Sequence, residues 1–448
     1  MGRLGNTGAF RLALLWGAVC GHLLVGHKAQ ALIVKTYNGP GTPNVINTSA
    51  PADDPGWHNV PSNRSGVYLG NQWVLTAAHA SEGDVDLPGG TYSMIPGTTV
   101  TLTNPGFFNG QSLDSFSDLK LFRIDTHPST GLTPEQQDPN VQEITLATER
   151  PTAGTTNGTE VLMIGAGGRR SQSGSSSTGQ RDFNSSYQTV PEGTGSFQGY
   201  LVETNNEPLR VKAWGTNRVI SPAFVPGGFD NGQNLLVETD NNDVLGLVTR
   251  FDRGLNGAGV PISDGSLFDE AQAAGGDSGG PVFFKDDSNE WVLGGVMHAI
   301  YINNNQPVSV SVFGNFTAFT DLSIDHYSDQ IEALKLSNQY SIVGDVDLDG
   351  VVTGSIVNGE ATGDLAELID GWLYNQAEAD IVSWKKGDLN QDGVTNIADF
   401  VMLRSALGGA ISTAEFASLV NNVGVPEPST LCLAMMLAAA SMASRRRS

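Results

Sequence analysis

The strongest constraint on the fold is the alternation of short apolar runs with turn residues. From residue 32 to about residue 336, Gly, Asn and Thr separate β-branched or aromatic runs such as 73–76, 161–164 and 291–293. Runs of this length bounded by turn residues are typical of all-β sandwiches and barrels. The sequence therefore predicts a mainly β fold for this region.

Two other segments belong to this region. Tyr327, Ile331 and Leu334 recur at helical spacing and predict a helix that closes the domain. The stretch 169–199 is rich in Ser, Gly and Gln and carries too little apolar surface to order by itself. We expect it to be a mobile surface insertion; the alternative is a linker between two domains.

The beginning of the chain carries an export pattern. Two arginines precede an apolar run over 12–25, and a small-x-small sequence at 29–31 has the form that signal peptidase cuts. We expect residues 1–31 to be a signal peptide and the mature chain to begin near Leu32.

The end of the chain carries a second pattern. A Pro-Glu-Pro element at 426–428 precedes an apolar run over 431–443 and three arginines. This arrangement resembles a PEP-CTERM sorting signal over 424–448, which implies an exosortase-type sorting enzyme as a partner and transient attachment to the inner membrane. The run of about 13 residues is shorter than the roughly 20 that span a bilayer, although a short membrane anchor is the alternative. Both interpretations predict a secreted or cell-surface protein.

Cysteine content and charge limit how the mature protein can be stabilised and what it can bind. The two cysteines, Cys20 and Cys432, lie in the segments that we expect to be removed, so disulfides cannot stabilise the mature fold. Removing residues 1–31 and the tail after Thr430, which together carry six positive residues and no acids, takes the formal charge from −23 to −29. Such an acidic surface disfavours nucleic acid and anionic membranes as partners.

Two segments carry the residue types of nucleophilic serine catalysis. One is Gly275-Gly276-Asp277-Ser278-Gly279-Gly280-Pro281, where glycines around a serine permit a tight turn whose amides can face an oxyanion. The other is Trp73-Val74-Leu75-Thr76-Ala77-Ala78-His79, where an apolar run and small residues precede a histidine. A nucleophilic serine needs such an imidazole as its general base.

These segments, in this order, resemble the histidine and serine segments of chymotrypsin/trypsin-like serine peptidases. The resemblance implies a double β-barrel with a C-terminal helix over 32–338 and hydrolysis of a polypeptide through an acyl-enzyme, with no cofactor for catalysis. It also implies Ser278 as nucleophile, His79 as base, and the amides of Gly276 and Ser278 as oxyanion hole.

The acid of the triad is expected at Asp118, which begins an apolar strand and lies between His79 and Ser278 as the family order requires. Asp114 and Asp125 are the rivals. Asp125 sits at the far end of that strand, where a turn acid is natural, and Asp114 lacks an adjoining strand.

The substrate pocket departs from the family pattern. By alignment, Gln272 stands at the pocket floor, His298 stands where serine is usual, and Ile300 stands where glycine keeps the pocket open. We expect no trypsin-like preference, and His298 is either an electrostatic modifier of the site or a structural histidine. No Ile-Val-Gly-Gly segment follows the cleavage site, so we do not expect Asp277 to pair with a newly cut N-terminus.

Acidic residues become periodic after residue 340. The sequence 344–350 recurs at 387–393, and the second copy has oxygen-bearing residues at every ligand position of a calcium loop, with glycine at the sixth. These ligands are Asp388, Asn390, Asp392, Val394 through its carbonyl, Asn396 and Asp399.

The first copy is incomplete. Asp345, Asp347, Asp349 and Thr353 occupy ligand positions, but the twelfth position is Ile356, which cannot bind a metal ion. An insertion over 355–363 would let Asp364 serve instead.

The helical patterns after the two loops, over 365–373 and 397–407, complete a resemblance to type I dockerins over 339–412. That resemblance implies a small α-helical domain with Ca²⁺ and a cohesin-like partner. A calcium-stabilised spacer is the equal alternative. For the whole chain, the two functions in competition are a surface-sorted serine endopeptidase and a non-catalytic surface binding protein on a protease-like fold.

Overall fold

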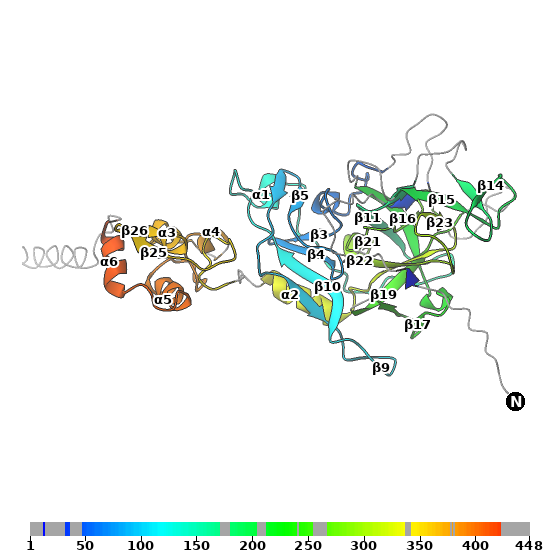
Figure 1. Cartoon of the computed structure of the whole chain (residues 1–448). Helices are drawn as coiled ribbons and strands as arrows, with labels where there is room; N and C mark the ends of the chain where they lie inside the picture. The colour runs from blue at the N-terminus through cyan, green and yellow to red at the C-terminus, as the bar shows by residue number, and fades with distance from the viewer. Residues whose placement is uncertain are drawn as a thin grey trace, which may run out of the picture. The chain divides into compact units, whose positions relative to one another are not determined.

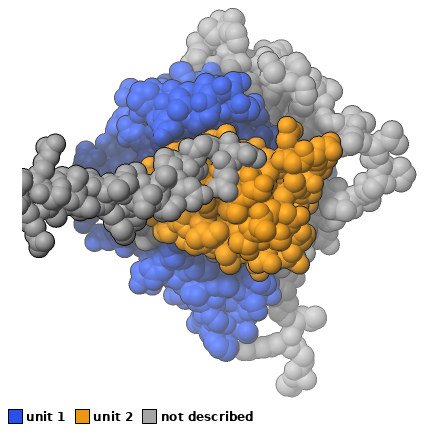
Figure 2. Space-filling view, turned by 90° about the vertical axis from the view of Figure 1, so that its left-hand side faces the viewer, with its two compact units in different colours: residues 1–94, 99–337 blue, residues 95–98, 338–448 orange. Residues whose placement is uncertain are grey.

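The structure is a computed structural model that describes residues 12–13, 32–35, 47–170, 180–203, 212–239, 242–253, 267–336, 342–376, 379 and 381–422. The chain divides into two compact units, one of residues 1–94 and 99–337 and one of residues 95–98 and 338–448 (Figure 2). The sorting signal and nearly all of the signal peptide lie outside the described residues. Within those residues, no helix combines the length and apolarity needed to cross a membrane.

The first unit contains one closed six-stranded antiparallel barrel (Figure 1). Around the barrel, each strand pairs with the next and the last returns to the first. In that order the strands are β11 (Glu160–Gly165), β16 (Ala213–Ile220), β19 (Asp243–Arg250), β24 (Phe316–Thr320), β22 (Trp291–Tyr301) and β21 (Pro281–Lys285). The predicted mainly β class is confirmed, with one closed barrel.

A second sheet forms the N-terminal half of this unit. Its strand order is β3 (Val67–Gly70), β4 (Trp73–Ala77), β10 (Phe116–Arg123) and β7 (Val100–Thr103), and one parallel pair joins β10 to β19. The paired strands that the structure describes here form an open sheet. Of the two barrels predicted, one is therefore closed, and the second is not confirmed.

The predicted closing helix is confirmed as α2 (Asp325–Leu336). Its Tyr327 hydroxyl donates to Oδ1 of Asn104 at 2.6 Å and accepts from the amide of Leu245 at 3.2 Å. Asn104 follows β7 and Leu245 lies in β19, so this single buried side chain joins the open sheet to the barrel.

The Ser/Gly-rich insertion is partly ordered, contrary to the prediction of a mobile segment. Its strands β13 (Arg181–Phe183), β14 (Thr189–Val190) and β15 (Phe197–Glu203) form a small sheet with β12 (Arg169–Arg170) and β23 (Val310–Val312). Phe183 and Tyr187 are buried there, and the rings of Tyr187 and Phe197 stack with centroids 5.0 Å apart. These aromatic residues supply the apolar core that the composition of the stretch concealed; residues 171–179 lie outside the described part.

Short elements complete the first unit. Three short helices are 3-10 helix 57–59, α1 (Pro134–Gln137) and 3-10 helix 222–224. The paired strands are β1 (Leu12–Ala13) on β22, β2 (Ile33–Val34) with β20 (Ala271–Gln272), β5 (Val85–Leu87) with β6 (Gly90–Tyr92), β8 (Phe107–Phe108) with β9 (Gln111–Ser112), and β17 (Phe229–Asp230) with β18 (Leu235–Glu238), which also pairs with β19.

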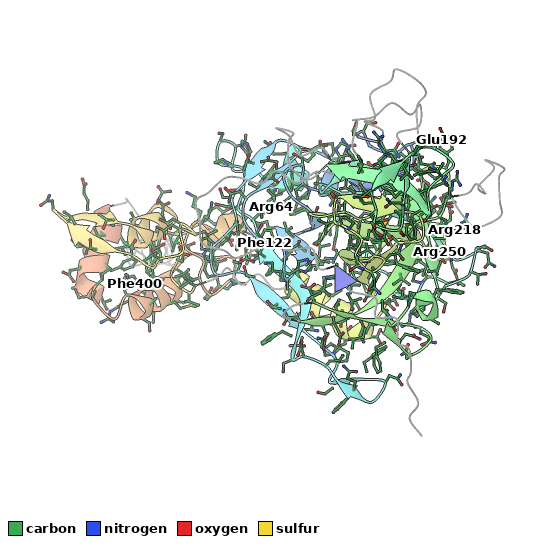
Figure 3. All side chains as sticks on the ribbon, turned by 45° about the vertical axis from the view of Figure 1, so that its right-hand side comes forward. Arg64, Phe122, Glu192, Arg218, Arg250 and Phe400 are labelled. Carbon is green, nitrogen blue, oxygen red and sulfur yellow. The ribbon has the colours of Figure 1, made fainter. Side chains whose placement is uncertain are left out.

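The second unit is small and helical. It contains the helices α3 (Asp364–Asp370), α4 (Ile381–Trp384), α5 (Ile397–Ala406) and α6 (Thr413–Asn422) and a hairpin of β25 (Ser355–Val357) and β26 (Glu360–Thr362). Phe400, labelled in Figure 3, is buried and stacks on Phe416 with ring centroids 3.6 Å apart. The helices predicted after the two loops are confirmed as α3 and α5.

Candidate active site and calcium loops

His79 lies two residues beyond β4 and is held by one carboxylate. The backbone N–H of His79 donates to Oδ1 of Asp118 at 2.9 Å, and its ring Nδ1 donates to Oδ2 at 2.7 Å. The β4–β10 register, which pairs Ala77 with Leu119, brings the two residues together. The structure thus joins the predicted base to the predicted acid.

Asp118 is completely buried, which alone would raise the pKa of its carboxyl. The interactions of the carboxylate with two imidazoles, those of His298 and His79, outweigh this burial and hold the pKa of Asp118 well below its usual range. Of the two rival acids, Asp114 is exposed, and Oδ1 of Asp125 accepts from the amide of its neighbour Thr126 at 2.6 Å. Asp118 is the carboxylate that meets His79.

The Ser278 turn packs directly on the end of β4. Gly279 has φ +89°, and a Cβ atom there would lie 2.0 Å from Oγ1 of Thr76, so no larger residue fits this contact without displacement. The Gly279 amide donates to the carbonyl of Met297 at 2.7 Å. Ser278 is therefore fixed between β22 and the strand that leads to His79.

The reactive atoms of Ser278 and His79 lie in this buried region. Oγ of Ser278 and Nε2 of His79 are both inaccessible to solvent, and neither has a hydrogen-bond partner in the described part of the chain. The hydrogen bond expected between these two atoms is not formed in this structure. Catalytic hydrogen bonds are often long in enzymes without substrate and tighten when substrate binds.

The amides predicted to form the oxyanion hole lie in the same turn. Across the described ranges, the amides of Gly276 and Ser278 donate to no protein oxygen. The carbonyl of Gly276, whose φ is +94°, accepts from Oγ of Ser65 at 2.7 Å. Two amides beside the serine thus have their N–H groups available for an oxyanion.

Asp277 anchors the turn from inside the barrel. Its carboxylate accepts from the amides of Gly167 at 2.6 Å and Ala274 at 2.8 Å. A Cβ atom on Gly165 would lie 2.2 Å from Oδ1 of Asp277 and 3.3 Å from Cδ2 of Leu32. The buried side chain of Leu32 and the Asp277 carboxylate thus flank Gly165 on the inner side of the barrel.

The three residues predicted to line the substrate pocket are all buried. Gln272 accepts from Oγ of Ser311 at 2.9 Å, and Ile300 belongs to an apolar cluster with Met297 and Phe319. Their assignment to a pocket stays a prediction.

Sequence reasoning assigned His298 to the substrate pocket, as an electrostatic modifier or a structural histidine, and missed its contact with Asp118. Its Nδ1 lies 2.9 Å from Oδ2 of Asp118, and its Nε2 bonds to Oγ1 of Thr320. The available signal was a histidine among the mainly apolar residues of β22. A pocket alignment assigns that residue to substrate rather than to the acid.

The strand β22 offers a backbone edge next to the serine turn. Up to Val296 this edge pairs with β21, at Met297 it bonds to the amide of Gly279, and at Ile300 and Tyr301 it pairs with β1. An extended segment can therefore add to β22 beside Ser278.

In the second predicted calcium loop, backbone amides hold two of the carboxylates in place. Oδ1 and Oδ2 of Asp388 accept from the amides of Asp392 and Gly393, and those of Asp399 accept from Asn390 and Asn396. Burial is the main cause that raises the pKa of Asp399, and the charge of Asp388 adds to it. Asp388 and Asp399 have no cationic side-chain partner in the part of the chain that the structure describes.

The first loop repeats this frame. Asp345 accepts from the amides of Asp349 and Gly350, and Asp364 accepts from those of Val346, Asp347 and Thr353. The inserted residues form the β25–β26 hairpin, which lets Asp364 reach the position that Ile356 cannot serve. Burial and the neighbouring acids raise the pKa of Asp345 to about 6.

Comparisons with known proteins add little to this geometry. No family model and no curated protein matches the chain. Among solved structures, the Haemophilus influenzae Hap adhesin matches with 14% identity and a TM-score of 0.30 over 68% of this chain. The match covers 25% of that protein, so this chain spans about a quarter of its length. A similarity this low supports no functional argument.

Proposed function

We propose that the protein is an exported serine endopeptidase with a Ser278–His79–Asp118 triad. In this proposal the open sheet stands for the first barrel of a chymotrypsin-like fold and the closed barrel for the second. The observation that supports it most is the pair of hydrogen bonds from His79 to the carboxylate of Asp118. The Ser278 turn packs on the end of β4, the strand that leads to His79. Local motifs of the sequence and long-range packing agree on one group of residues.

In the proposed reaction, Oγ of Ser278 attacks the carbonyl carbon of a peptide bond, and Nε2 of His79 takes the hydroxyl proton. The amides of Gly276 and Ser278 stabilise the oxyanion, and the ionised Asp118 stabilises the imidazolium. His79 then gives its proton to the leaving amine, leaving an acyl-enzyme. Water repeats the sequence on the ester and releases the acid product and Ser278.

A polypeptide substrate suits the edge of β22 that pairs with β1, a strand within the predicted signal peptide. Because β1 already pairs there with Ile300 and Tyr301, an extended peptide can bind in the same way through its main chain. Main-chain binding aligns several residues of a substrate without demanding a large side-chain pocket. This fits the buried positions of Gln272 and Ile300.

We also propose that removal of the signal peptide activates the enzyme, contrary to the expectation drawn from the missing Ile-Val-Gly-Gly segment. A cut before Leu32 creates an α-amino group on a residue whose side chain lies beside Gly165, where the Asp277 carboxylate also lies. A positive charge next to this buried carboxylate would stabilise the turn that carries Ser278.

For the second unit, we propose two calcium ions, held by the two sets of loop residues described above. Their carboxylate and carbonyl oxygens are the ligands that Ca²⁺ prefers, and bound Ca²⁺ would supply structural stability. A cohesin-like partner, the exosortase-type enzyme and a cell-surface location are parts of the same proposal that rest on sequence resemblance.

A fluorophosphonate probe tests the peptidase proposal. The mature protein should be labelled at Ser278, whereas Ser278→Ala and His79→Ala should not react. Ser288→Ala is a matched control because Ser288 is exposed in the turn between β21 and β22. A folded wild-type protein that takes no label and cleaves no peptide library would favour the non-catalytic binding function instead.

A further inference from the structure

Two imidazoles share one oxygen of Asp118. Nδ1 of His79 and Nδ1 of His298 lie 2.7 and 2.9 Å from Oδ2, and the backbone N–H of His79 donates to Oδ1. An ionised carboxylate only accepts hydrogen bonds, so both Nδ1 atoms carry hydrogen. Asp118 therefore receives three donors while it is completely buried.

The other nitrogen of His298 fixes its charge. Nε2 bonds to the hydroxyl of Thr320, and among the described residues this hydroxyl has no other partner. When His298 is neutral, Nε2 accepts the hydroxyl proton and every group is satisfied. When His298 is charged, Nε2 donates instead and leaves the buried hydroxyl proton without an acceptor. Thr320 thus favours the neutral ring.

Among the residues that the structure describes, two titratable groups contact His298 directly. The titratable groups that face it are Asp118 from β10 and His79 from the end of β4, while β24 presents Thr320. Of the described charged groups on or next to the neighbouring strands, Lys120 pairs with Glu82, Lys285 with Asp53 and Asp321 with Arg150. Arg123 donates to the carbonyl of Asn71, and Asp277 accepts from the amides of Gly167 and Ala274.

We propose that His298 is a positioning residue. Its neutral imidazole donates a hydrogen bond that holds Asp118 in place, and Thr320 sets the tautomer of His298. This proposal rests on the proposed peptidase function. Three donors fix the carboxylate without cancelling its charge, so the full negative charge remains for the imidazolium that His79 becomes during the reaction. A cationic His298 would compete for that charge and weaken His79 as a base.

Kinetics separate this role from plain packing. His298→Leu should lower kcat about 10- to 100-fold, as expected for the loss of one hydrogen bond to a charged group, with KM nearly unchanged. His298→Asn places an amide donor near the position of Nδ1 and should recover much of the loss. Thr320→Val should lower kcat more than Thr320→Ser, which keeps the hydroxyl. Equal kcat in His298→Leu and wild type would overturn the proposal.

A proton NMR measurement does not depend on activity. In Ser278→Ala protein with ¹⁵N-labelled histidine, we expect two strongly downfield imidazole N–H resonances, one lost in His79→Ala and the other in His298→Leu. Finding His298 protonated only on Nε2, or doubly protonated at pH 7, would overturn the proposal. An absence of peptidase activity alongside both resonances would instead reject only the proposed function. If His298→Leu does not fold, the Thr320 pair decides, since a Thr320→Val spectrum and kcat equal to those of Thr320→Ser would contradict the role of the hydroxyl.

Discussion

The backbone N–H and the ring Nδ1 of His79 bind the two oxygens of a single carboxylate, that of Asp118, at 2.9 and 2.7 Å. The first contact fixes where the chain turns after β4, and the second fixes the direction of the ring. Because Asp118 is buried in β10, both contacts are set by the pairing of two central strands rather than by a mobile loop.

Replacement of Asp118 by Asn should therefore damage catalysis more than the fold. The amide nitrogen of the new side chain would face an N–H of His79 or His298, so one ring must change tautomer or turn away. We expect kcat to fall about 10⁴-fold, as for loss of the orienting acid in a triad. Asp114→Asn is the control, because Asp114 is exposed and lies four residues away. A loss below tenfold in a folded Asp118→Asn protein would rule out Asp118 as the acid.

The contact between Gly279 and Thr76 predicts a second sensitive position. Gly279→Ala combines an unfavourable positive φ with a Cβ atom 2.0 Å from Oγ1 of Thr76, so the Ser278 turn must move. We expect a loss of roughly 2 kcal/mol or more in the free energy of unfolding, and slower fluorophosphonate labelling. Gly314→Ala has the same backbone strain, with φ +97°, but meets no atom within 4 Å. If both variants label at the wild-type rate, the turn contact does not position Ser278.

Local sequence was sufficient for the parts of this site that lie on one strand or one turn. The apolar run before His79 and the glycines around Ser278 predict a strand and a tight turn from their own chemistry. The bond from His298 to Asp118 spans 180 residues and depends on how β22 packs near β10, so no local pattern carries it. The same limit applies to the small sheet around Phe183, because its core is completed by Val310 and Val312 from a distant segment.

Retention of residues before Leu32 should reduce activity. A chain that begins at Leu32 carries its α-amino group on the residue whose side chain lies beside Gly165, as the Asp277 carboxylate does, whereas an extension of several residues moves that charge away. We expect slower labelling at Ser278 in the extended protein. Asp277→Asn should slow the reaction of the shorter chain, with little further effect on the extended one. Identical rates for the two chains would exclude activation by signal-peptide removal.

Glu270 predicts a pH dependence of stability. Burial raises the pKa of Glu270 to about 8, although the amides of Leu267 and Asp252 donate to its carboxylate. The unfolded chain loses this proton near pH 4.5, so the folded state binds more protons between these values and stability falls as pH rises from about 5 to 8. The decrease should be on the order of a few kcal/mol and should be smaller in Glu270→Gln. Urea unfolding across this pH range measures it, with exposed Glu290→Gln as the control; an unchanged slope in Glu270→Gln would assign the dependence elsewhere.

Calcium removal provides the test of the second unit. Two equivalent loop frames predict two ions per chain, and binding at 100 times Kd would stabilise the unit by about 2.7 kcal/mol per ion. Chelation should therefore lower the melting temperature of this unit. Calorimetric titration should find one remaining ion in Asp399→Ala and one in Asp364→Ala, while Asp370→Ala, whose exposed carboxylate pairs with Lys386 at 2.7 Å, should retain two. Two ions in Asp364→Ala would mean that the first loop closes without the residue that the β25–β26 hairpin brings to it.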